Sequence, residues 1–309
     1  MPIGVALVQA RPEHLDLPAT MGKTLALATA AAKGGARIIV FGETWLTGYP
    51  AWIDSCPSAA LWGNEPTKQA FAKLRMNSIT VPGPEIDTLA NLAGKLEVVI
   101  VMGAHERVAA GPGAGTLYNA LLTFGPDGKL LNHHRKLVPT YTEKLVWGSG
   151  DGAGLNVCDT PYGRISGSIC WEHWMPLARQ TLHEQGEDIH IAAWPTVHDM
   201  HQLASRHYAF EGRCYVLASG TLMKVRDLPE GLDPTPDLVG KPDELLVRGG
   251  SCIIGPDGKF IVEPVFDVET IVTATLEPLP LEAERMTLDV AGHYARPDVF
   301  SFGVNKERP

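Results

Sequence analysis

The sequence lacks an excess of basic charge and any run of lysine or arginine. Its 309 residues include 26 basic and 35 acidic side chains, a formal net charge of −9. We therefore expect neither a nucleic acid nor an anionic membrane surface as a partner. No stretch reaches the roughly 18 consecutive apolar residues of a membrane span, and the apolar segment at the N-terminus has no basic lead typical of a signal peptide. These absences predict a soluble, cytoplasmic protein.

Cysteine is scarce and shows no pairing pattern. The chain has five cysteines, an odd number, and no two of them stand in C-x-x-C spacing. Neither a disulfide framework nor a zinc ribbon is predicted, and we expect reduced thiols in a reducing compartment. The five are Cys56, Cys158, Cys170, Cys214 and Cys252.

Recognisable metal and nucleotide motifs are also missing. His198, His201 and His207 lie near Asp199, but their spacing matches no standard zinc motif, and H-E-x-x-H is absent. The glycine-rich segments 111–115 and 148–152 lack the lysine of a phosphate-binding loop. We therefore expect no metal and no cofactor.

The composition is that of a globular protein. Hydrophobic residues make up 45% of the chain and charged residues 20%, which is enough apolar material for a full-sized core. No Ser/Gly/Pro linker, charge block or repeat interrupts residues 6–300. The sequence thus predicts one domain over residues 1–309.

Apolar segments alternate with amphipathic ones, which is typical of an α/β fold. The second predicted element, a helix, should end at Gly34 and Gly35. Strands are predicted over residues 3–9, 37–42, 98–103, 163–169 and 189–194, and helices over 18–33, 85–94 and 175–184.

The same four-residue turn occurs twice between apolar segments. Gly-Pro-Asp-Gly separates residues 120–124 from 130–134, and again separates 251–254 from 260–262. Glycine, proline and aspartate favour a tight turn, so each pair of segments is predicted to form a β-hairpin. Antiparallel hairpins beside parallel strands indicate mixed sheets.

Cys170 follows a predicted strand directly and precedes a predicted helix. Such an elbow presents a side chain beyond the sheet and points backbone N–H groups at it, which lowers the pKa of a thiol from about 8.5 and forms an oxyanion hole. The plain alternative for a lone cysteine is an ordinary buried residue. Position alone does not separate the two.

Three charged residues are the candidate partners of this thiol. Glu43 follows a strand and has aromatic neighbours that would raise its pKa, so it could act as a general base. Lys136 follows another strand, and Glu143 lies seven residues further on in an aromatic loop. Their plain alternatives are a solvated strand end, a basic sheet edge and a surface carboxylate.

The segments around these residues resemble the nitrilase branch of the carbon-nitrogen hydrolase superfamily. Residues 35–50 around Glu43, residues 134–152 around Lys136 and Glu143, and residues 170–179 from Cys170 are similar to three signatures of that family. Segments 249–251 and 292–300 also resemble it. The chain departs from the family at Thr47, where proline is common, at Tyr141, where some members carry histidine, and at Ser166, where glycine is usual.

The resemblance implies a four-layer αββα sandwich and a cofactor-free hydrolase acting on a nitrile and water. Cys170 would attack the nitrile carbon, Glu43 would take the thiol proton, Lys136 would stabilise developing charge, and Glu143 would position Lys136 or a water. The family also implies a homo-oligomer built from dimers. The residues expected to line the pocket are Tyr49, Tyr141, Trp147, Trp171 and Trp194.

Other functions remain open at this point. The same residues could hydrolyse an amide, as in an amidase or carbamoylase, although the Cys-Trp-Glu triplet at 170–172 favours a nitrilase. A cyanide-degrading enzyme would need a very small pocket. A catalytically silent binding protein would have no reason to keep a thiol, an ammonium and a carboxylate at three strand ends.

Overall fold

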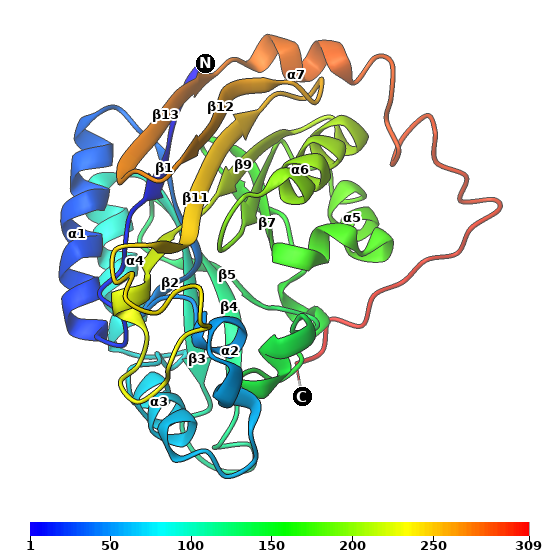
Figure 1. Cartoon of the computed structure of the whole chain (residues 1–309). Helices are drawn as coiled ribbons and strands as arrows, with labels where there is room; N and C mark the ends of the chain where they lie inside the picture. Colours follow the sequence, from blue (N-terminus) through cyan, green and yellow to red (C-terminus); the bar gives the residue numbers. More distant parts are fainter. Residues whose placement is uncertain (309) are drawn as a thin grey trace.

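The computed structural model describes residues 1–308, in which two mixed β-sheets stack face to face with helices on both outer sides (Figure 1). This is the four-layer αββα sandwich that the resemblance implied. Within the described residues, no helix combines the length and apolar character needed to cross a membrane.

The first sheet has six strands in the order β13-β1-β2-β3-β4-β5. Its central strands β1, β2 and β3 are parallel, and β13, β4 and β5 pair antiparallel at the two sides. The strands are β1 (Ile3–Gln9), β2 (Ile38–Leu46), β3 (Val99–Arg107), β4 (Leu117–Phe124), β5 (Leu130–Arg135) and β13 (Thr270–Leu276).

The second sheet has seven strands, with the main order β10-β11-β9-β8-β7-β6 and with β12 paired to β11. The strands β7, β8 and β9 are parallel, and the others pair antiparallel. They are β6 (Cys158–Thr160), β7 (Gly163–Ile169), β8 (Ile189–Ala193), β9 (Tyr215–Ser219), β10 (Leu222–Lys224), β11 (Leu245–Ile254) and β12 (Phe260–Phe266).

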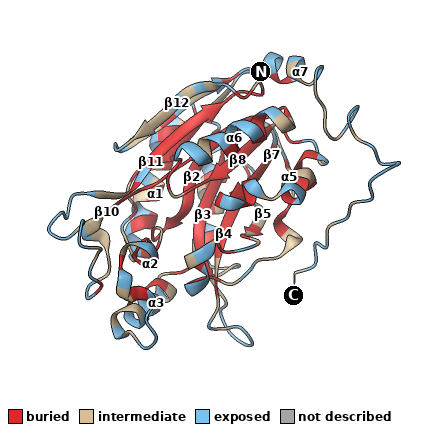
Figure 2. Ribbon diagram, turned by 45° about the vertical axis from the view of Figure 1, so that its right-hand side comes forward, coloured by how far each residue is buried: buried red, intermediate tan, exposed pale blue. Residues whose placement is uncertain are grey.

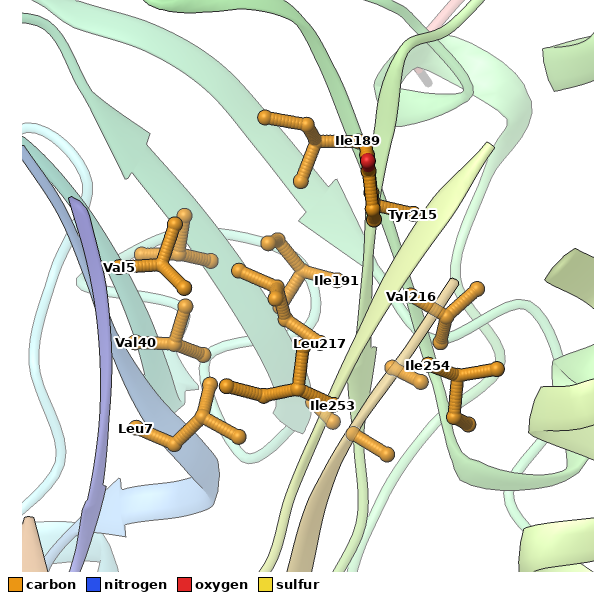
Figure 3. Close-up of a cluster of buried hydrophobic side chains, with 14 of the residues drawn as sticks. Val5, Leu7, Val40, Ile189, Ile191, Tyr215, Val216, Leu217, Ile253 and Ile254 are labelled. Carbon is orange, nitrogen blue, oxygen red and sulfur yellow. The ribbon is translucent and has the colours of Figure 1, made fainter. Parts of the chain in front are cut away.

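One hydrophobic cluster fills the space between the sheets. Because side chains alternate along a strand, Val5 and Leu7 of β1 point into this cluster, whereas Ala6 and Val8 point to the helix layer. The opposing sheet contributes side chains such as Leu217, and Figure 3 shows both sets facing each other. Both faces of these strands are buried, which explains their almost continuous apolar sequences.

Helices cover the outer faces of both sheets, and the strands between them are buried (Figure 2). On the six-stranded sheet lie α1 (Leu17–Lys33) and α4 (Pro84–Leu96), which contribute to its outer cluster. On the other sheet, α6 (Asp199–Gly212) packs into the core, and the ion pair Arg179–Glu211 at 2.6 Å joins it to α5 (Pro176–His183). The remaining helices are α2 (Trp52–Ser55), α3 (Glu65–Met76) and α7 (Pro278–Glu284).

The strands, helices and hairpins expected from the sequence are all present. The first hairpin pairs β4 with β5, and the second pairs β11 with β12, both antiparallel. Differences lie at the boundaries: β2 continues past its expected end to Leu46, so Glu43 lies inside the strand. Helices α3 and α6 were not anticipated; His198 is the N-cap of α6, and His201 and His207 lie within it.

Candidate active site

Glu43 is presented by an irregularity in β2. The regular pairing of β2 with β3 ends at Phe41 and resumes at Leu46, and Thr44 between them has φ +48°. A bulge of this kind redirects a side chain. It also needs Gly103 on β3, because a Cβ there would lie 2.1 Å from the carbonyl oxygen of Gly42.

Lys136 follows β5 and is held by its own backbone. Its N–H donates to the carbonyl of Asn119 at 2.8 Å, and its carbonyl accepts from the N–H of Gly150 at 2.8 Å. Gly150 can come this close because it has no side chain: a Cβ would lie 2.3 Å from the carbonyl oxygen of Arg135. The glycine-rich segment 148–152 therefore supports the lysine.

Cys170 stands at the turn that follows β7. Its φ of +52° is in the left-handed region, which is rare and strained for a residue with a side chain. The turn continues as a 3₁₀ helix over Cys170–Trp174 before α5 begins at Pro176. A nucleophile held at a strained elbow is a recurrent arrangement in hydrolases.

Glu143 lies in a 3₁₀ helix (Tyr141–Leu145) and is buried, so it is not a surface carboxylate. Its Oε2 accepts from Lys136 Nζ at 2.7 Å and from the N–H of Thr140 at 2.7 Å, and its Oε1 accepts from Tyr49 Oη at 3.1 Å. Three hydrogen bonds fix this carboxylate in place.

The four side chains lie close together. Cys170 Sγ and a carboxylate oxygen from each of Glu43 and Glu143 lie within 4.8 Å of one another. Lys136 Nζ also donates to Glu43 Oε1 at 3.2 Å, and Asn119 Nδ2 donates to the same oxygen at 2.7 Å. Glu43 Oε2 is buried and makes no hydrogen bond among the described residues. It is the oxygen free to receive a proton.

Burial controls the titration of this cluster. Removal from water raises the pKa of Glu43 to about 7, although Lys136 opposes this shift. Burial also raises the pKa of the Cys170 thiol well above its ordinary value, and the two carboxylates add to that effect against Lys136. Burial alone would lower the pKa of Lys136, but the surrounding negative groups raise it. The resting site thus holds Cys170 as a neutral thiol, Lys136 as an ammonium, and Glu43 as a base whose pKa lies near 7.

The expectation of a lowered thiol pKa was wrong. The elbow does aim a backbone N–H, that of Trp171, at the sulfur. Complete burial and the neighbouring carboxylates outweigh this interaction. Cys170 therefore depends on a base to become a thiolate.

The two carboxylates and the thiol are also a set of atoms that could in principle ligate a cation. Lys136 donates to both carboxylates and so already supplies the positive charge between them. This donor set fits a buried ammonium. Within residues 1–308, His198, His201, His207 and Asp199 do not bring three ligand atoms close enough together to hold an ion.

A pocket of about 430 Å³ opens onto Cys170 and Glu143. Tyr49, Tyr141 and Trp171 line it, as expected from the sequence. Tyr141 and Trp171 are 85% and 53% exposed, which places them at the open side of the pocket. The volume is within the range of small-molecule sites.

Trp147 and Trp194, in contrast, do not line this pocket. Trp147 packs behind Tyr49 with ring centroids 6.0 Å apart. Trp194 is fully buried and stacks on His173, whose Nδ1 donates to the carbonyl of Cys170 at 2.6 Å. Both tryptophans contact residues of the pocket wall, Trp147 against Tyr49 and Trp194 against His201.

Sequence reasoning missed three residues of this region. Asn119 on β4 holds Glu43, and His201 at the start of α6 lines the pocket. Glu172 is buried and accepts from His134 and from the backbone of Leu137 and Ile169. No spacing signal marks Asn119 or His201, because both reach the site from elements far away in sequence. Glu172 stands in the Cys-Trp-Glu triplet, which could have singled it out.

The fold and the site together define a hydrolase in which a cysteine, a lysine and two glutamates lie side by side in one buried cluster. The family model of carbon-nitrogen hydrolases matches residues 4–282. The chain belongs to this family, whose members act on carbon-nitrogen bonds other than peptide bonds, and within it to the nitrilase branch.

Relatives along the whole chain bear nitrilase names. A nitrilase 2 from an unidentified prokaryote is 40% identical over 99% of this chain and 93% of its own. The aliphatic nitrilase of Sinorhizobium fredii is 39% identical over 98% of this chain and 95% of its own. A bifunctional nitrilase/nitrile hydratase of Lupinus angustifolius is 38% identical over 99% and 87%.

Solved structures share the fold at lower identity. A carbon-nitrogen hydrolase from Helicobacter pylori superposes with a TM-score of 0.70 at 19% identity, covering 97% of both chains. A branch 10 member of the nitrilase superfamily from Saccharomyces cerevisiae gives 0.67 at 22% identity, covering 95% of this chain and 96% of its own.

Proposed function

We propose that the protein is a nitrilase that hydrolyses an organic nitrile to the carboxylic acid and ammonia, with Cys170 as the nucleophile. One observation carries the proposal: a strained, buried thiol lies within 4.8 Å of two carboxylates, and Lys136 donates to both of them. A nitrile carbon is a weak electrophile and needs a thiolate, a base to generate it and a donor for the nitrogen. The names of the relatives agree with this chemistry.

In the first step the sulfur of Cys170 bonds to the nitrile carbon while the thiol proton passes to Glu43 Oε2, the oxygen without a partner. One C–N π bond breaks, and its electron pair moves to nitrogen, beside Lys136. Return of the proton from Glu43 to that nitrogen gives a neutral thioimidate. One well-placed donor such as Lys136 is worth roughly 10²–10³ in rate.

In the second half a water adds to the thioimidate carbon, and a carboxylate of the site takes the water's proton and passes it to the nitrogen. The tetrahedral intermediate expels ammonia and leaves a thioester on Cys170. A second water hydrolyses this thioester, releasing the acid and the thiol. The sum is one nitrile and two waters giving one acid and one ammonia.

The test compares turnover in two cysteine variants. Purified protein should release ammonia and acid from at least one of a panel of aliphatic, aryl and arylacetic nitriles. Cys170→Ala should lose this turnover and keep its circular dichroism spectrum. Cys158→Ala, which removes another buried thiol of the same sheet, should remain active. Turnover by folded Cys170→Ala would contradict the proposal.

The same panel separates the other functions. Matching amides and carbamoyl compounds test an amidase or carbamoylase, and cyanide tests a cyanide-degrading enzyme. Released amide is measured as well, since relatives are named both nitrilase and nitrile hydratase. Because Lys136 supplies the positive charge, turnover should survive a chelator.

The expected assembly into a homo-oligomer built from dimers stays part of this proposal. Its support is that four large apolar side chains are exposed on α5 and α6, two helices that the Arg179–Glu211 ion pair joins, because exposed apolar surface favours protein contacts. They are Leu177, Met200, Leu203 and Phe210.

A further inference from the structure

His201 stands in the wall of the catalytic pocket, at the first turn of α6. It lines the same cavity as Cys170 and Glu143. Its ring stacks on Trp194, with centroids 4.4 Å apart and planes inclined by 19°. The fully buried indole thus fixes the plane of the imidazole.

The tautomer of His201 follows from its hydrogen bonds. Nδ1 lies 2.6 Å from the carbonyl oxygen of Thr196 and 3.3 Å from the backbone nitrogen of His198. The contact with Thr196 is the shorter one, and a carbonyl oxygen only accepts, so Nδ1 carries a proton and donates it to Thr196. In a neutral imidazole the other nitrogen, Nε2, then has a free lone pair.

The ring is neutral at neutral pH. Burial lowers the pKa of His201 below its ordinary value of 6.5, and the nearby His198 and Lys136 lower it further. Nε2 makes no hydrogen bond within residues 1–308 and is not sealed from solvent. Since the ring lines the cavity, this acceptor is open to a bound molecule.

We propose that His201 is a specificity-determining residue, whose Nε2 accepts a hydrogen bond from a hydroxyl or amino donor on the substrate. The enzyme then favours nitriles that carry such a donor near the cyano group over alkyl nitriles of the same shape. The proposal rests on the proposed function, because it concerns the pocket around Cys170. A site built to accept a hydrogen bond discriminates against the analogue without the donor, since its polar atom is left unpaired.

The experiment is a double-mutant cycle between the substrate and the protein. Two nitrile pairs serve as probes, 2-hydroxy and 3-hydroxy nitriles, each against the twin with methyl in place of hydroxyl. kcat/KM is measured from the acid released, for the parent protein and for His201→Phe, which keeps an aromatic ring over Trp194 and lacks the acceptor. His201→Gln, with an amide oxygen that can accept, is the conservative variant.

The parent protein should prefer the hydroxy nitrile of at least one pair. We expect His201→Phe to reduce that preference by about tenfold, the effect of one lost hydrogen bond, and His201→Gln to restore part of it. His207→Leu, an exposed histidine of the same helix, should leave the preference unchanged. Because the preference is the ratio of kcat/KM between the two members of a pair, any general loss of activity in a variant cancels.

The assignment is overturned if His201→Phe keeps the parent's preference for the hydroxy nitrile. If kcat/KM in that variant also falls, equally for both members of each pair, His201 acts on the attacking water or in packing. Asp54 on α2 is a second acceptor of the same pocket, and a preference that is lost only in Asp54→Asn would transfer the role to it. A protein that releases acid from no nitrile would instead refute the proposed function.

Discussion

The chemistry of the site depends on how Glu43 is solvated. One of its oxygens accepts from Lys136 and Asn119, and the other is buried with no hydrogen-bond partner among residues 1–308. Burial costs the charged form more than these two bonds return, which is why the pKa of Glu43 rises to about 7. A base with a pKa near the working pH is the most effective one.

This environment predicts an acidic limb in the pH profile. The deprotonated carboxylate is the active form, so kcat/KM should fall as pH drops below about 7, by about tenfold per pH unit. Asn119 stabilises the charged form, and Asn119→Leu should therefore move the limb to higher pH. The measurement is kcat/KM from pH 5 to 9 for the parent protein and for Asn119→Leu. A profile without the acidic limb, or a limb at the same pH in both proteins, would contradict the role of Glu43 as the base.

Glu143 differs from Glu43 because both of its carboxylate oxygens accept hydrogen bonds. Glu143→Gln would set an amide N–H against Lys136, Tyr49 or the N–H of Thr140. We expect kcat to fall by roughly 10²–10³ with a modest change in KM, since the ammonium is misplaced at the barrier. Steady-state kinetics against Glu65→Gln, an exposed control, measures this.

Mass spectrometry divides the role of Glu143 further. Cys170 that is still modified by substrate in Glu143→Gln would place the carboxylate in the later water steps. Unmodified Cys170 would place it in the first attack. Parent-level turnover would reduce the catalytic set to Glu43, Lys136 and Cys170.

At the scale of elements, one side chain joins two catalytic loops. Glu172, in the turn after β7, accepts from His134 Nε2 at 2.9 Å, from the N–H of Leu137 at 2.8 Å and from the N–H of Ile169 at 2.7 Å. Burial raises its pKa, but His134 and the two N–H groups outweigh this effect and lower it. The loop of Cys170 is thereby tied to the loop of Lys136.

Removal of this tie should cost both stability and activity. Glu172→Ala leaves a buried histidine and two buried N–H groups without a partner, so the free energy of unfolding should fall by about 3–5 kcal/mol. Turnover should fall as well, because the thiol and the ammonium lose their common support. Guanidinium unfolding monitors the first effect. Glu184→Ala, an exposed residue of the helix region that follows, should change neither.

At the scale of the whole molecule, the site is assembled across the two sheets. Glu43 and Lys136 come from the six-stranded sheet, on β2 and after β5, whereas Cys170 follows β7 of the seven-stranded sheet. The shared core between the sheets sets the distance between base and nucleophile (Figure 3). Packing far from the pocket therefore bears on catalysis.

Leu217 tests this dependence. Its side chain is fully buried between the sheets, and Leu217→Ala should lower the free energy of unfolding by about 2–5 kcal/mol. kcat should fall too, because the substitution leaves a cavity between the sheets and the sheets can then shift relative to each other. Leu279→Ala, at an exposed leucine of α7, is the matched control. Unchanged kcat in a destabilised Leu217→Ala would show that the distance is fixed locally.

Much of this arrangement is encoded locally. The alternation of apolar residues predicts the strands, because side chains on a strand point to opposite faces, and Gly-Pro-Asp-Gly predicts both hairpins, because those residues favour tight turns. Glu43, Lys136 and Cys170 stand out because each lies in its own signature. These features can be predicted from the sequence because each depends only on residues that are neighbours in the chain.

Tertiary structure decided the properties that depend on distant neighbours. The raised pKa of Cys170 results from burial and from two carboxylates, Glu43 on β2 and Glu143 in the 3₁₀ helix 141–145, which reversed the expectation from its elbow. Trp194 is fully buried in the core and so lies behind the pocket wall. His201 lines the pocket because the first turn of α6 lies beside it. Desolvation and side-chain direction are set by what packs around a residue, and sequence neighbours alone do not specify that.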